Sequence, residues 1–95
     1  MSQKVYTVSP NYILRELAGK HIIVPVGEGV ADFCGIISIN KTGVCLWEML
    51  QSKASREQLL SGLLQRFDVS SEEAGNDIDE FLNELQAHNI LQVVL

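Results

Sequence analysis

The chain has 95 residues, enough for one hydrophobic core and too few for two, so we expect a single domain over residues 1–95. Hydrophobic residues make up 46% of the sequence and charged residues 20%, and no apolar run approaches the roughly 20 residues that span a bilayer. This composition excludes a disordered chain and a membrane-spanning helix. The formal charge of −5 opposes nucleic-acid phosphates, and the 7 Lys and Arg residues form no run, so we expect no nucleic-acid partner.

The first forty residues have strand character. Tyr12–Leu17 is an apolar-rich run, and Ala18-Gly19-Lys20 follows it as a hairpin turn. The second run, His21–Val24, ends at Pro25, which cannot donate to a sheet ladder. After a glycine-containing loop, the β-branched run Phe33–Ile39 predicts a third strand. Two hairpin-like connections over three short strands predict a small antiparallel sheet.

The third strand stops at an Asn-Lys-Thr-Gly corner that leads into the first helix. Asn40 is a turn former, and Thr42 is the expected N-cap because its hydroxyl can accept a free helical N–H. Apolar residues then recur at spacings of three and four, with Trp47 as the expected core anchor. The corner therefore places a strand edge beside a bundle of helices.

Two capping boxes predict where the next two helices begin. Ser55-Arg56-Glu57-Gln58 precedes a leucine-rich stripe in which Gly62 marks either a close helix approach or a weak spot. Ser70-Ser71-Glu72-Glu73 opens the third helix, which Asn89 ends, and the tail from Ile90 is a short closing strand or an irregular end. Strands followed by helices predict an α+β fold of winged-helix type, with a three-stranded antiparallel sheet followed by three helices.

No catalytic or metal-binding pattern stands out in the sequence. His21 and His88 lie in different elements with no Cys or carboxylate at ligand spacing, and the serines lack a His or Lys partner. Gly27-Glu28-Gly29 is too short and too acidic for a phosphate cradle. The carboxylates of the third helix lie mostly opposite its apolar stripe, where a solvated surface is the default, although they can attract a basic peptide. We therefore expect no enzymatic activity, metal or cofactor.

The N-terminal residues and the cysteines indicate the compartment in which the protein is expected to act. The segment MSQKVYTVSPNYI lacks the basic region and long apolar block of a secretory signal, so we expect a cytoplasmic protein with reduced thiols. Cys34 and Cys45 are too far apart for a C-x-x-C pair, and each lies within an apolar segment. We therefore interpret both as buried structural thiols rather than as a disulfide or a metal site.

The third strand is the remaining candidate for a binding surface. An unpaired strand edge presents a row of free N–H and C=O groups. Because this strand bears Ile36, Ile37 and Ile39 without a protecting Pro or charge, it invites another strand to pair with it. From the residues alone, a bound peptide, a covering N-terminal arm and a dimer mate are all open.

A set of positions running through most of the chain occurs in a distinctive order. These positions are Ile39-Asn40-x-Thr42-Gly43, Leu46-Trp47, Leu50, Ser55, Leu59, Leu63, Asp77-Ile78, Phe81-Leu82, Leu85 and Ile90-Leu91. The order resembles the PqqD family, the small peptide chaperones of pyrroloquinoline quinone synthesis, and the wider group of peptide-recognition domains in pathways of ribosomally made, modified peptides. The resemblance covers residues 14–91. Because Gln51-Ser52-Lys53-Ala54 and Asn89 depart from the family's usual Asp-Gly turn and terminal Gly, it supports the broader family rather than the quinone pathway.

The resemblance implies a non-catalytic chaperone that holds the leader segment of a precursor peptide for a modifying enzyme, often a radical S-adenosylmethionine maturase. In such domains the leader adds as a strand to the third strand and lies in the groove between that strand and the third helix. Carried over to this sequence, the implied peptide-binding residues are Gly35, Ile36, Ile37, Ser38 and Ile39, together with exposed parts of Ile78, Phe81 and Leu85. Backbone pairing would supply affinity, and alternate side-chain pockets would supply selectivity.

Two alternatives to leader binding stay open. A winged-helix DNA-binding or regulatory domain has a compatible order of elements, but its recognition helix needs Lys or Arg, and Ser71–His88 contains neither. The other alternative is a homodimer in which the third strand pairs with its twin.

Overall fold

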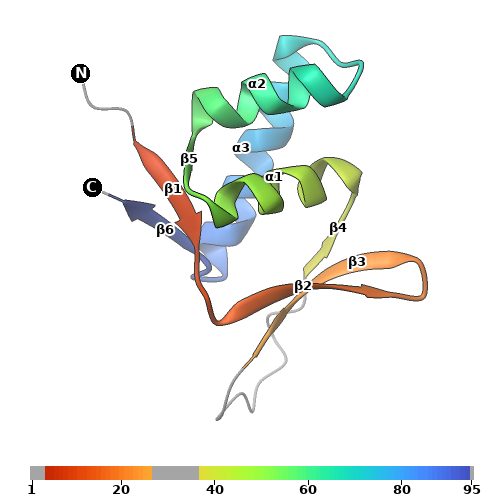
Figure 1. Ribbon diagram of the computed structural model, residues 1–95, viewed down its shortest axis with the longest axis vertical. Coiled ribbons are helices and arrows are strands. Elements are labelled where there is room, and N and C mark those ends of the chain that lie inside the picture. Colours follow the sequence, from red (N-terminus) through yellow and green to blue (C-terminus); the bar gives the residue numbers. More distant parts are fainter. Residues whose placement is uncertain (1–3, 27–36, 95) are drawn as a thin grey trace.

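The computed structural model describes residues 4–26 and 37–94 of the chain (Figure 1). Its elements in chain order are β1 (Val5–Val8), β2 (Tyr12–Leu17), β3 (Lys20–Pro25), β4 (Ile37–Ile39), α1 (Lys41–Gln51), β5 (Ala54–Ser55), α2 (Arg56–Arg66), α3 (Ser71–Ala87) and β6 (Leu91–Val94). Three helices and an antiparallel three-stranded sheet confirm the predicted α+β fold. In the described part of the chain, none of the helices has the length and apolar character needed to cross a membrane.

The predicted antiparallel sheet consists of β2, β3 and β4 in that order. Its register pairs Leu14 with Ile23 and Ile23 with Ile37, so these three side chains share one face of the sheet. Ile23 and Ile37 are buried, and Leu14 packs against the same core. β4 lies at the edge of this sheet, because within the described residues β3 is its only strand partner.

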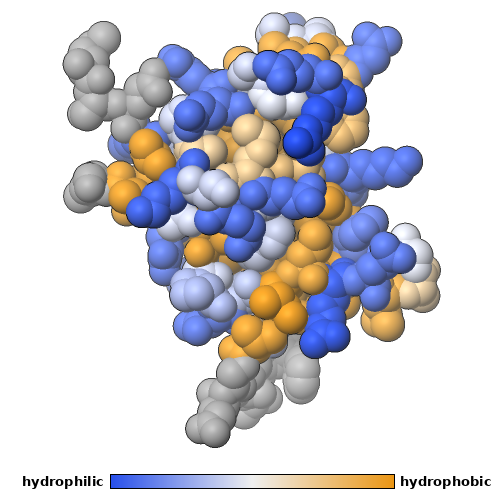
Figure 2. All heavy atoms as spheres, viewed as in Figure 1, coloured by the Kyte–Doolittle hydropathy of each residue, from blue (hydrophilic) through white to orange (hydrophobic). Residues whose placement is uncertain are grey.

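A two-residue turn joins β2 to β3. Ala18 and Gly19 have φ angles of 53° and 80°, and the type I′ hairpin turn requires a positive φ at both central residues. The turn falls within the predicted Ala18-Gly19-Lys20 segment, and β3 ends at Pro25 as expected. Figure 2 shows apolar side chains gathered over the open end of this hairpin.

A second sheet, absent from the sequence prediction, brings the two ends of the described chain together. Its order is β5-β1-β6, and β1 pairs antiparallel with both neighbours. Thr7 Oγ1 of β1 donates a hydrogen bond to the carbonyl oxygen of Leu50 at 2.8 Å, which ties this sheet to the end of α1. The tail after Ile90 is thus a strand rather than an irregular end. At four residues β1 is too short for its periodicity to be read from the sequence.

The first helix begins at a different cap from the one expected. Asn40, and not Thr42, is the N-cap of α1, since Asn40 Oδ1 accepts a hydrogen bond from Gly43 N at 2.9 Å. Asn40 therefore serves both as the turn former of the corner and as the cap of the helix. Trp47 is 3% exposed, which confirms it as a core anchor. Cys45 is buried as predicted, whereas Cys34 lies outside the described residues.

The predicted starts of α2 and α3 are confirmed. Ser55 Oγ accepts from Gln58 N at 3.2 Å and Gln58 Oε1 accepts from Ser55 N at 2.9 Å, which completes the first capping box. At the start of α3, Ser70 Oγ accepts from Glu73 N at 3.1 Å, whereas the reciprocal bond from Ser70 N to the Glu73 side chain, the other half of the predicted capping box, does not form. After α3, Asn89 adopts a φ of 60°, the left-handed conformation expected of the residue that ends this helix.

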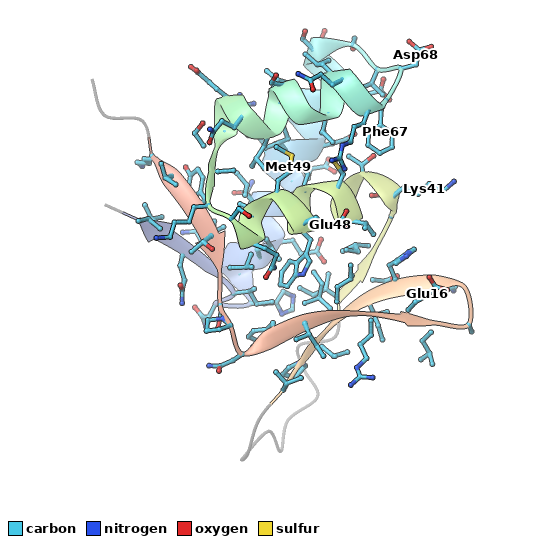
Figure 3. All side chains as sticks on the ribbon, in the orientation of Figure 1. Glu16, Lys41, Glu48, Met49, Phe67 and Asp68 are labelled. Atoms are coloured by element: carbon cyan, nitrogen blue, oxygen red, sulfur yellow. The ribbon has the colours of Figure 1, made fainter. Side chains whose placement is uncertain are left out.

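Gly62 is a point of close approach between α1 and α2. A Cβ atom at Gly62 would lie 2.5 Å from Met49 Sδ. Figure 3 shows Met49 extending from α1 toward α2. Gly62 therefore lies at a close helix approach, but the contact is with the flexible end of Met49, which can move aside for a methyl group.

An ion pair joins α2 to α3 at the surface. Arg56 Nε donates to Asp79 Oδ1 at 2.9 Å and Arg56 Nη2 donates to Asp79 Oδ2 at 3.1 Å. Arg56 Nη2 also lies 3.4 Å from the carbonyl oxygen of Gly75. The hydrogen bond from Arg56, with its charge, lowers the pKa of Asp79, and Asp79 in turn raises the pKa of Arg56.

Adjacent serines test the cap of α3. Ser70→Ala removes the acceptor for Glu73 N, so we expect it to lower the free energy of unfolding by about 1 kcal/mol. Ser71→Ala is the matched control, because Ser71 is exposed and is the first residue of the helix rather than its cap. Urea unfolding of both variants measures the difference. Equal stabilities would show that the Ser70 bond contributes nothing.

The pH dependence of stability tests the ion pair. The pKa of Asp79 is lower in the folded chain than its unfolded value of 3.8. The ion pair therefore adds to the free energy of unfolding above pH 3.8, and this addition is lost as pH falls through the lower pKa of the folded chain. Both side chains are about half exposed, so we expect Asp79→Asn to cost only about 0.5 kcal/mol at pH 7. The difference from the unmodified chain should begin to shrink as pH falls below 3.8 and should vanish once pH is below the lowered pKa of Asp79 in the folded chain. A difference that persists at low pH, measured by urea unfolding, would contradict this account.

Candidate functional site

A groove of about 140 Å³ lies between β4, the start of α1 and α3. Its lining is Ser38, Ile39, Asn40, Thr42, Gly43, Leu46, Asp77, Glu80, Phe81 and Glu84. The groove thus brings together the edge strand and the third helix, the two elements that the sequence analysis named as a binding surface.

The floor of the groove depends on a glycine. Gly43 is buried in the first turn of α1, and a Cβ atom there would lie 2.9 Å from Ile39 Cβ and 3.4 Å from Phe81 Cε1. A side chain at this position would push β4 or α3 away from α1. Leu46, one turn further along α1, is 1% exposed and closes the apolar floor.

β4 contributes its outer edge to this site. β3 pairs with one side of β4 through Ile23↔Ile37, Ile22↔Ser38 and His21↔Ile39. No other described strand pairs with the opposite side. In an antiparallel pair the N–H and C=O groups of successive residues point alternately toward the partner strand and away from it. The outer side of β4 therefore presents backbone donors and acceptors at the groove.

The predicted binding residues fall into distinct places. Ser38, Ile39 and Phe81 line the groove. Ile37 is 3% exposed and belongs to the core. Gly35 and Ile36 lie outside the described residues, so the part of the prediction that concerns them stays a prediction.

The expected exposure of two residues on α3 is wrong. Ile78 and Leu85 are both 0% exposed and belong to the hydrophobic core. Phe81 is 8% exposed and stands at the border between the core and the groove. Apolar periodicity identifies the whole stripe of a helix but does not separate the residues at its centre from those at its border.

One lip of the groove is acidic. Asp77, Glu80 and Glu84 stand at positions i, i+3 and i+7 of α3, on the same side of the helix as Phe81. Glu80 and Glu84 are exposed, and Asp77 is half-buried. Within the described parts of the chain, none of the three carboxylates forms an ion pair. The groove therefore combines an apolar floor, a free strand edge and a negatively charged lip.

Several groove residues were not among the predicted binding residues, although the sequence carries signals for them. Gly43 and Thr42 belong to the Asn-x-Thr-Gly corner, where a glycine inside the first helical turn marks a close approach. The carboxylates of the third helix were expected mostly on the face opposite the apolar stripe, whereas Asp77, Glu80 and Glu84 border the groove beside Phe81. The sequence does not show how α3 is oriented against β4, and this orientation determines which residues of α3 face the groove.

The chemistry that this arrangement supports is recognition of an extended chain. The lining contributes backbone hydrogen-bonding groups, apolar surface and carboxylates, and the described residues of the lining include no His or Cys. His21 lies elsewhere, on the β2–β3 hairpin, with its Nε2 3.4 Å from Glu16 Oε2. In the residues that the structure describes, no group of three or more His, Cys, Asp or Glu side chains is placed to hold a metal ion.

A pair of glycine substitutions tests the close approach of β4 and α3 to α1 at the groove floor. We expect Gly43→Ala to destabilise the chain by about 2 kcal/mol, because the new methyl group meets the backbone-proximal Cβ of Ile39. Gly62→Ala is the matched control, since its methyl group meets only the flexible end of Met49 and gains up to about 1 kcal/mol of helix propensity. Urea unfolding compares the two. Equal effects would mean that Gly43 is not a tight contact.

Comparison with solved structures finds the same fold. One match is "TbiB1 in Complex with the TbiA(beta) Leader Peptide", with a TM-score of 0.68 and 14% sequence identity, covering 90% of this chain and 94% of that one. Another is "Lasso peptide synthetase B1 complexed with the leader peptide", with a TM-score of 0.68 and 14% identity, covering 92% of this chain and 96% of that one. At this level of identity the likeness establishes the fold alone.

Comparison by sequence points to one family. A search of curated proteins finds no match to this sequence. The sequence model of the family described as coenzyme PQQ synthesis protein D (PqqD) matches residues 20–91, more than half of the chain. The matched range includes β4, α1 and α3, which together form the groove. The chain therefore belongs to the PqqD family.

Proposed function

We propose that this chain is a peptide chaperone that binds the leader segment of a ribosomally made precursor peptide and presents it to a modifying enzyme, such as a radical S-adenosylmethionine maturase. The observation that carries the proposal is the unpaired edge of β4 beside the groove of α1 and α3. Membership of the PqqD family supports it, as do two structures of the same fold whose names describe complexes with a leader peptide.

The mode of binding that we propose is strand addition. The leader would extend the β2-β3-β4 sheet by pairing with the outer side of β4. The three residues of β4 span about 10 Å, so the paired segment is short and the groove must supply further contact. Alternate side chains of the added strand would point toward Gly43 and Phe81. Ladder hydrogen bonds would then supply affinity for any sequence, and the groove would select among sequences.

We also propose that the domain is not itself an enzyme. Its role would be to raise the local concentration of a precursor peptide at the enzyme that modifies it, which requires binding groups and no reacting group. Such a domain would act in the cytoplasm, where precursor peptides are made. Residues 1–95 would serve as one binding unit.

A DNA-binding role has less support. A recognition helix needs Lys or Arg to meet phosphates and base edges. α3 contains neither, and its exposed side at the groove carries Asp77, Glu80 and Glu84. A homodimer that pairs β4 with its twin would use the same edge as the leader, so leader binding and self-pairing would compete.

Binding of leaders with modified backbones tests strand addition. Fluorescently labelled leaders of small precursor peptides encoded beside this gene should bind the full chain in anisotropy titrations, and scrambled leaders should bind more weakly. Because only every second backbone N–H of an added strand points toward β4, we expect single N-methylation along the bound segment to abolish binding at alternate positions. Sedimentation at several concentrations shows whether the free chain is a dimer.

Two results would contradict the proposed function. The first is failure of several neighbouring leaders to bind. The second is binding that is insensitive to N-methylation at every position, because a peptide held by side chains alone does not need its backbone donors. Self-association that the leader does not reverse would favour the homodimer.

A further inference from the structure

The acidic lip gives the groove a charge preference that the strand edge alone would not have. Asp77, Glu80 and Glu84 lie in a row about 10 Å long on α3, on the side that faces the groove. A peptide lying in the groove would displace water from these carboxylates. Removing charges from water is costly unless an opposite charge replaces the solvent.

No basic side chain of the described chain neutralises the lip. β4 and α3 contain no Lys or Arg, and the groove lining contains none. Lys41, at the start of α1, points away from the body of the molecule in Figure 3. An occupant of the groove must therefore bring its own positive charge, because otherwise the three carboxylates repel one another without a counter-charge.

The spacing of the lip fits an extended chain. Along α3, Phe81 lies four residues from Asp77 and three from Glu84, which corresponds to about 6 Å and about 4.5 Å along the helix axis. Side chains on one face of a β-strand recur about every 6.7 Å. Phe81 lies between the two glutamates in sequence and belongs to the groove lining. For a chain that runs along α3, an apolar side chain over Phe81 would thus place the side chains two residues away within reach of Asp77 or Glu84.

We propose that the segment bound in this groove is a basic one, with a Lys or Arg two residues away from an apolar side chain that contacts the floor at Gly43 and Phe81. This inference rests on the proposed function, since it names the class of peptide that the same groove takes. The charge of the lip disfavours acidic segments by repulsion and steers basic ones toward the edge of β4.

Selection from a peptide library tests the preference without knowledge of the natural leader. Random 12-residue peptides displayed on phage are selected on the immobilised full chain. We expect the recovered peptides to be enriched in Lys or Arg two positions from an apolar residue. The net charge of −5 attracts any basic peptide weakly, so a local effect must be separated from a global one.

Two charge-matched variants make this separation. Glu80→Gln/Glu84→Gln removes two charges from the lip, and Glu48→Gln/Asp68→Asn removes two charges elsewhere. Glu48 and Asp68 are exposed and lie outside the groove lining, on α1 and after α2 (Figure 3). For a selected peptide we expect at least about fivefold weaker binding to the lip variant and less than about twofold weaker binding to the control.

A substitution in the selected peptide completes the comparison of the two charge variants. Replacing its basic residue with Gln should weaken binding to the unmodified chain by about fivefold and to the lip variant by less than about twofold, because the two changes remove the same ion pair. Hydrogen exchange at the backbone amides of Ser38 and Ile39 reports whether each peptide occupies the edge of β4.

The outcomes separate this inference from the proposed function. Peptides that protect the amides of β4 yet show no basic enrichment, or bind both charge variants equally, would overturn the charge preference and leave strand addition intact. Selected peptides that bind without protecting β4, or a library that yields no binders, would overturn both.

Discussion

The site depends on the close approach of one strand and two helices at Gly43. Only a residue without a side chain lets Ile39 of β4 and Phe81 of α3 lie this near to α1. The Asn40 cap fixes where α1 begins, and so places Gly43 inside the first helical turn rather than before it. A short corner thereby determines the depth of the groove and the position of the strand edge beside it. The remaining elements pack around this arrangement and stabilise it through the shared hydrophobic core.

The same physical features explain why an exposed strand edge can be tolerated here. Natural proteins protect sheet edges by keeping them short and placing charges near them. β4 has three residues and stands beside a row of carboxylates, so a second acidic copy of this chain meets repulsion there. The β2-β3-β4 sheet also ends at β2, and the β5-β1-β6 sheet ends at β5 and β6, yet none of these three strands contributes to the lining of the groove. Among the edge strands of the described residues, β4 is the one whose backbone borders the groove between α1 and α3.

The parts of this fold that could be predicted are those set by local chemistry. The Ala18-Gly19 turn, the Ser55 capping box and the end of α3 at Asn89 each depend on a few adjacent residues, and each was found from the sequence. The second sheet was not, because β1 and β6 become strands through pairing between distant parts of the chain. Pairing of that kind leaves little periodicity in segments of four residues.

The candidate site was predicted as a pair of elements but not residue by residue. The strand edge and the third helix follow from element order and from the family resemblance. The division of α3 into core residues such as Ile78 and groove residues such as Glu80 depends on how that helix is rotated against β4, which is a property of tertiary packing. Gly43 is conspicuous only once its neighbours in space are known.

The most direct test of the central claim is an NMR titration of the isotope-labelled full chain with the leader of a small precursor peptide encoded beside it. We expect chemical shift changes concentrated at Ser38 and Ile39, at Thr42 and Gly43, and along Phe81–Glu84. The exposed edge of β6, around Val93, should be unaffected and serves as an internal control. Changes centred on β6, or none with several such leaders, would contradict a peptide site at the edge of β4.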